Sequence, residues 1–257
     1  MRPYRDEFIE FCLLHADNSP GDSEAYADVH GFLERLLALC HPVEAQNRWS
    51  EWHFDAQHFT NREFVLYLLA TLTQRRQCKV AARLMDDRYQ FAELHSMQSR
   101  TRTLSAFDEY PRSLDEVRKN RLELRPVSVS GDMVREWATH PRITFRDLIH
   151  TDLVLAIRGP MTDASNGHNW WPRLLPYTES VGPIDVLAKA TTSPGLTAVR
   201  DLFGAKSLPE LAVQVARALA SDRLSGIAKS PDVWLRGRIF ERLLNWDELR
   251  HHLPSPR

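Results

Sequence analysis

The segment 146–152 places an aspartate and a histidine where they could transfer protons together. Asp147 and His150 are three residues apart, so in a helix they lie on one face. A carboxylate at that spacing can orient an imidazole, and an aspartate–histidine pair is a common general base. In the structural alternative, which we favour, Asp147 caps a helix and His150 packs at its end. The two residues are nevertheless candidate catalytic residues.

A polar loop at residues 158–173 carries the densest group of side chains suited to binding. It holds two adjacent tryptophans and four charged or titratable side chains. These residues are Arg158, Asp163, His168, Trp170, Trp171 and Arg173. Tryptophan offers a large rigid surface, and tryptophan and arginine dominate the energetics of many interfaces. The loop is therefore a candidate binding site, with one alternative: one tryptophan enters the core and the polar side chains are only solvated.

Arg135 and His140 have four residues between them, a spacing that resembles the Rx4H element of HEPN-type ribonucleases. The resemblance implies acid–base chemistry by His140 on a 2′-hydroxyl and stabilisation of phosphate charge by Arg135. The family's motif lies inside a long helix, whereas Pro141 ends any helix here at His140. We therefore expect Arg135 on a solvated face and His140 near a helix C-terminus, where a cation is favoured by the helix dipole.

The sequence gives little support for a bound metal or cofactor. His53, Asp55 and His58 are close together, but the two histidines are five residues apart and do not share a helix face. The three cysteines are far apart and form no zinc-binding spacing. Glycine-rich phosphate loops and the zinc-protease and kinase motifs are absent. We expect neither a metal nor a cofactor.

Composition limits the classes of function. The chain has 257 residues, with 33 basic and 34 acidic side chains and a formal charge of −1. This balance argues against a protein that mainly coats duplex nucleic acid. No apolar run is long enough to cross a bilayer, and the N-terminus has no secretory pattern. Together with few cysteines, these features predict a soluble, cytoplasmic protein without a membrane association.

Apolar periodicity predicts a helix-rich α+β fold. In the N-terminal half, Thr60 and Glu63 form a capping box before an apolar run, and Ser207 and Glu210 form another at the start of a helix expected over 207–220. The helix expected after Thr60 begins there and continues, or breaks and resumes, up to residue 95. The N-terminal half is predicted to be mostly helical, and the C-terminal half to place helices around a small sheet. The expected strands are residues 153–157, 174–177 and 184–188, and residues 124–129 are expected to enter a further strand.

The predicted organisation is a helical domain at 1–98, a connector at 99–112 and an α/β domain at 113–257, or one packed unit. Three functions remain open. The leading hypothesis is a non-catalytic interaction module, a subunit or adaptor that binds a protein partner. The second is an enzyme acting on RNA or nucleotides through histidine, aspartate and arginine residues of the C-terminal half. The third is nucleic-acid binding by an arginine-rich face with stacking tryptophans.

Overall fold

Helices form most of the described part of the chain, as its apolar spacing indicates. The computed structural model describes residues 2–18, 23–40, 50–92, 99–123, 128–162, 170–229 and 239–254. The chain divides into two compact units, unit 1 (Met1–Phe145) and unit 2 (Arg146–Arg257). Within the described residues the only sheet has two antiparallel strands. A helix-rich chain with a small sheet is thus confirmed, whereas the expected contrast between the two halves is not.

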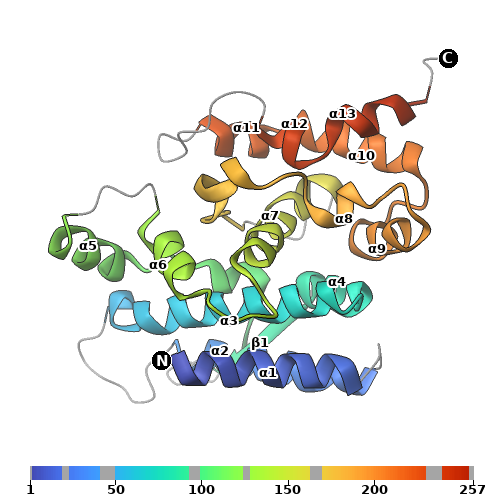
Figure 1. Cartoon of the computed structure of the whole chain (residues 1–257). Helices are drawn as coiled ribbons and strands as arrows, with labels where there is room; N and C mark the ends of the chain where they lie inside the picture. Colours follow the sequence, from blue (N-terminus) through green and yellow to red (C-terminus); the bar gives the residue numbers. More distant parts are fainter. Residues whose placement is uncertain are drawn as a thin grey trace. The chain divides into compact units, whose positions relative to one another are not determined.

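Unit 1 is organised on one long central helix, α3. Its elements are α1 (Arg2–Asn18), α2 (Ser23–Ala38), η1 (Glu51–Phe54), α3 (Asp55–Gln74), α4 (Cys78–Asp86), β1 (Arg88–Ala92), β2 (Ser99–Thr103), η2 (Leu104–Asp108), α5 (Arg112–Arg121) and α6 (Val129–Trp137). Residues 65–72 of α3 are buried on every face, so this helix forms the middle of the core of unit 1. Figure 1 shows α1 running alongside α3.

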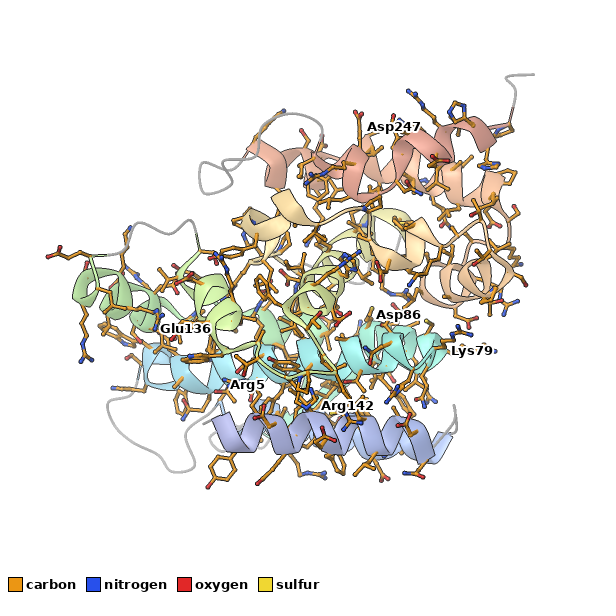
Figure 2. The ribbon with its side chains drawn as sticks, in the orientation of Figure 1. Arg5, Lys79, Asp86, Glu136, Arg142 and Asp247 are labelled. Carbon is orange, nitrogen blue, oxygen red and sulfur yellow. The ribbon has the colours of Figure 1, made fainter. Side chains whose placement is uncertain are left out.

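A buried ion pair and a ring stack join α1 to α3. Arg5, labelled in Figure 2, donates two hydrogen bonds to the Glu63 carboxylate, at 2.6 and 3.1 Å. Both side chains are buried, and the Arg5 guanidinium lies 5.1 Å from the ring centroid of Trp137. Phe8 stacks on Phe64 with the ring centroids 4.3 Å apart. The bidentate pairing satisfies two charges that would otherwise be costly to bury in this core.

The sheet lies in unit 1, so the prediction of a sheet in the C-terminal half is wrong. Strand β1 pairs with β2 in antiparallel register, with Arg88 opposite Thr103. Helix α4 ends at Asp86, so the helix expected up to residue 95 also ends earlier. The sequence signal is the alternation of exposed Arg88, buried Tyr89 and exposed Gln90, which is the period of a half-buried strand.

Tyr89 fixes β1 to the helices around it. Its ring is fully buried, 4.8 Å from the His30 ring and 5.6 Å from the Phe107 ring, measured between centroids. Its hydroxyl donates a hydrogen bond to the carbonyl of Leu84. A tyrosine buried with its hydroxyl satisfied is a strong anchor, because both its apolar and its polar parts are used.

Unit 2 begins with α7 (Phe145–Thr162), whose first residue is the last of unit 1. The elements that follow are η3 (Leu175–Ser180), α8 (Asp185–Ala188), α9 (Ser193–Phe203), α10 (Leu208–Leu219), α11 (Asp222–Lys229), α12 (Ile239–Leu243), α13 (Trp246–Leu249) and η4 (Arg250–His252). Ser207 caps α10 as its sequence predicts, since its hydroxyl accepts from the Glu210 N–H.

Three of the expected strands are helical instead, and of the strand entry expected at 124–129 the described residues, Ser128 and Val129, are the cap and first residue of α6. Residues 153–157 lie in the middle of α7, residues 174–177 fall mostly in η3, and residues 184–188 correspond to α8. All five side chains of 153–157 are buried, so this stretch of the helix has no polar face. A short run of this kind has neither the alternation of a strand nor the stripe of a surface helix, and its periodicity cannot separate the two.

The capping box predicted at Thr60 is also wrong, although the buried helix after it is confirmed. Helix α3 begins at Asp55, one turn earlier, and the Thr60 hydroxyl donates to the carbonyl of Ala56 at 2.8 Å. Glu63 does not reach back to a cap because it is paired with Arg5. No described helix is long and apolar enough to cross a membrane.

Candidate functional site

His150 lies in the second turn of α7 and faces a carboxylate that the sequence analysis did not consider. Its Nδ1 is 3.5 Å from Oδ1 of Asp185, at the start of α8. Asp185 also contacts Arg146 at 3.1 Å and Lys189 at 3.4 Å. The predicted neighbour, Asp147, adds only a smaller electrostatic effect on the imidazole. The cluster therefore joins α7 to α8 across 35 residues of sequence.

The environment of His150 favours a structural role over proton transfer. Burial lowers the pKa of His150, and Arg146 lowers it further, against the opposing effect of Asp185. Its Nε2 is buried and neither donates nor accepts a hydrogen bond within the described residues. A general base must reach the proton it abstracts, and this nitrogen is closed off from solvent. The imidazole packs as a neutral ring beside Asp185.

His140 is used to fasten a loop to α1. Its Nδ1 accepts from the Arg142 backbone N–H at 3.3 Å, which leaves the proton on Nε2, and Nε2 donates to Oε1 of Glu10 at 3.0 Å. The Arg142 guanidinium, labelled in Figure 2, pairs with the same carboxylate. Helix α6 ends at Trp137, so His140 lies beyond it, and Arg135 is exposed on α6. Both ring nitrogens of His140 are therefore engaged in hydrogen bonds within unit 1.

Trp170 belongs to the core of unit 2. Its ring is 2% exposed, and its indole Nε1 donates to Oδ1 of Asp152 at 2.7 Å. The second oxygen of Asp152 accepts from the Leu174 backbone N–H at 2.8 Å, and the Trp170 carbonyl accepts from Arg223 at 2.8 Å. Asp152 thus holds the chain on both sides of residues 171–173 against α7. Trp171, by contrast, is 40% exposed.

The other residues predicted for the binding loop do not form an exposed charged surface in the described structure. Arg158 and Arg173 are both buried. Asp163 and His168 lie outside the described residues. Of this predicted site, Trp171 is the residue that the described structure places at the surface.

An exposed surface that the sequence analysis missed lies where η1 meets α5. Asp55 accepts hydrogen bonds from the backbone N–H and the hydroxyl of Ser113, at 2.5 and 2.6 Å. The Ser113 hydroxyl is also 3.5 Å from the carbonyl of Trp52. These contacts hold Trp52 beside the first turn of α5, yet its side chain is 62% exposed. An indole left this far out of a folded unit is unusual.

The same surface combines apolar and basic side chains. Val117 and Arg121 are four residues apart, so they lie on one face of α5, and Tyr110 lies just before this helix. All three are exposed, and the Tyr110 hydroxyl donates to Asp115 at 2.5 Å. We call Trp52, Tyr110, Val117 and Arg121 the η1–α5 surface; Lys119, two residues from Val117, lies on the other side of α5. Helix α5 has four basic and two acidic residues, and three of the basic ones are in its last turn.

The local sequence did not reveal this surface, because exposure of Trp52 depends on contacts made 61 residues away. A basic last turn on a short helix is the one sequence feature that could have drawn attention to α5.

Two of the three thiols are kept protonated by burial, and the described residues hold no cluster of metal ligands. Burial raises the pKa of Cys12 to about 12, and Cys40 is shifted to the same value, so both thiols stay protonated at neutral pH. His53 accepts a hydrogen bond from the Ser50 backbone, and Asp55 caps α5, so each has a structural task. No group of three or more potential ligands is arranged to hold a metal in this part of the chain.

Comparisons with family models, with curated proteins and with solved structures give no match to this chain.

Proposed function

We propose that the chain is a non-catalytic interaction module that binds an acidic, amphipathic segment of a partner protein on the η1–α5 surface. The observation that carries the proposal is the exposure of Trp52 beside a basic helix. Tryptophan and arginine are the residues most often found at the energetic centres of interfaces. Here the hydrogen bonds between Asp55 and Ser113 hold the start of α5 beside η1, which carries Trp52, and Arg121 is in the last turn of α5.

Charge and shape favour an acidic protein segment as the occupant. Arg121 is exposed on the same face of α5 as Val117, whereas Glu116 is already engaged with Arg112 at 2.9 Å. The surface therefore presents positive charge to a ligand. Val117 has no group that pairs with a phosphate or a base, but it can pack against an aliphatic or aromatic side chain. An amphipathic acidic helix supplies both complements.

The contacts of the histidines support a non-catalytic role. The ring of His140 is held between Glu10 and a backbone N–H, and the ring of His150 is buried against Asp185. These contacts support a stabilising role for both residues within their units.

Fluorescence anisotropy with a labelled synthetic helix tests the proposal. The probe has about 15 residues, with leucine and phenylalanine on one face and glutamate on the other. We expect saturable binding that weakens about 30-fold in Trp52→Ala, which corresponds to the roughly 2 kcal/mol of an interface anchor. Trp171→Ala is the matched control, since it removes another exposed tryptophan. Its affinity should equal that of the wild type.

Two outcomes would overturn the proposal. One is an acidic helix that fails to bind, or that binds Trp52→Ala as tightly as the wild type. The other is an equally tight, Trp52-dependent interaction with a labelled single-stranded oligonucleotide, which would assign the surface to nucleic acid. The same helix with lysine in place of glutamate measures the part played by charge.

A further inference from the structure

Helix α1 carries a second exposed apolar face, distinct from the η1–α5 surface. Tyr4, Phe11 and Leu14 are 72%, 58% and 61% exposed. With Glu7 and Asn18 they form a row in which successive residues are three and four positions apart. This is the heptad spacing by which one helix packs along another. We call these five residues the α1 seam.

The seam lies directly opposite the face that α1 uses within unit 1. The buried side chains of this helix are Arg5, Ile9, Cys12, Leu13 and Ala16. At 3.6 residues per turn, these point about half a turn away from Phe11. Large apolar residues scattered singly over a surface are ordinary, but here Phe11 and Leu14 are neighbours on one helical row, and Tyr4 lies on the same row beyond Glu7. Helix α1 is therefore apolar on two faces, and one of them is left exposed by the described residues.

The charges beside the seam indicate which kind of helix fits it. Glu10 pairs with Arg142, and Asp17 pairs with Arg75 at 2.9 Å, both on the same flank of α1. All four side chains are about one-third to one-half exposed. Negative and positive side chains thus alternate along this side of α1. When two copies of a helix pack antiparallel, the same side of each helix faces its copy, and the residues along that side run in opposite directions.

We propose that α1 packs antiparallel against α1 of a second copy of this chain. Phe11 and Leu14 then fill the centre of the contact, while Glu7 and Asn18 lie towards its edges. In the reversed order, Arg142 approaches Asp17 of the second copy, and Arg75 approaches its Glu10. An acidic or a basic partner would leave half of these charges opposite a like charge, whereas a second copy complements all of them. The inference does not depend on the proposed function of the η1–α5 surface.

Analytical ultracentrifugation of the full chain tests this proposal. We expect a reversible monomer–dimer equilibrium that is measurable below about 100 μM. Phe11→Glu should raise the dimer dissociation constant roughly 100-fold, with the melting temperature unchanged because Phe11 is exposed. Val213→Glu places the same charge at another exposed apolar position, on α10, and should leave the dimer intact. A wild-type chain that stays monomeric at the highest concentration refutes the proposal.

Exchanging the charges of one ion pair distinguishes the proposed antiparallel α1–α1 dimer from association through any other apolar contact. The double variant Asp17→Arg/Arg75→Asp keeps the ion pair within each chain but reverses its direction. Across the contact it then sets arginine against Arg142 and aspartate against Glu10 of the other copy. We expect the dimer to weaken at least tenfold at low salt, with recovery as salt screens the repulsion. A dimer unaffected by both this variant and Phe11→Glu uses a different surface, and the proposal is then wrong.

Discussion

Replacing Asp152 should destabilise unit 2 far more than replacing an exposed residue does, because the Asp152 carboxylate accepts hydrogen bonds from two buried donors. Each oxygen accepts one hydrogen bond, from the Trp170 indole at 2.7 Å and from the Leu174 backbone at 2.8 Å. Hydrogen bonds to a charged group contribute about 1.5–3 kcal/mol each. Asp152→Ala should therefore lower the free energy of unfolding by about 3–6 kcal/mol. Urea denaturation followed by far-ultraviolet circular dichroism measures this difference.

Conservative variants separate the hydrogen bond from the packing of the ring. Trp170→Phe keeps most of the ring but removes the indole donor, so we expect a loss of about 1.5–3 kcal/mol. In a double-mutant cycle with Asp152→Asn, the two losses should not add, and the coupling should be about 1–2 kcal/mol. Trp171→Ala is the control and should cost less than about 1 kcal/mol, since this side chain is 40% exposed. An Asp152→Ala variant as stable as Trp171→Ala would show that the carboxylate does not hold unit 2 together.

Three further predictions follow from buried and paired groups. Burial lowers the pKa of His150 from its ordinary 6.5, so the unfolded chain binds the proton more tightly. Stability should therefore decrease as pH falls through and below 6.5, and His150→Gln should flatten that part of a pH series of urea midpoints. Glu63→Ala leaves Arg5 buried without its carboxylate, so thermal or urea unfolding should reveal a loss of about 3–5 kcal/mol. Labelled RNA should stay uncleaved with both wild type and His140→Ala, because the His140 ring is fully engaged; cleavage by the wild type alone would contradict this.

Local sequence patterns predicted the helices of this fold better than they predicted the tertiary contacts between them. The spacing of apolar residues indicated the helices, and the Ser207 cap was readable because all its parts lie within four residues. The identity of residues 153–157 was not readable, because burial on every side removes the periodicity that separates helix from strand. The strand at Tyr89 depends on rings from two other segments. No window of neighbouring residues contains that information.

In the candidate site, too, the sequence identified single residues but not the distant residues that contact them. Sequence reasoning identified His150 as a histidine with a carboxylate nearby, but the facing carboxylate is Asp185, 35 residues further along the chain. The core role of Trp170 was one of the two alternatives for its loop, and only the distance to Asp152 decides between them. The position of Trp52 beside α5 depends on a contact between its carbonyl and the Ser113 hydroxyl, 61 residues away. These features arise from tertiary contacts, which composition and spacing do not encode locally.

The Arg5–Glu63 pair has a consequence for the ancestry of this chain. Losing either partner leaves a buried charge, so a lineage that replaces one residue passes through a destabilised intermediate. Descendants should then retain both residues or have exchanged both for apolar ones. Arg5 and Glu63 are 58 positions apart, and the pair can persist after the exposed residues around it have diverged. A charge pair joining the first helix to a long central one is therefore a marker by which distant relatives of this chain could be recognised when overall similarity has faded.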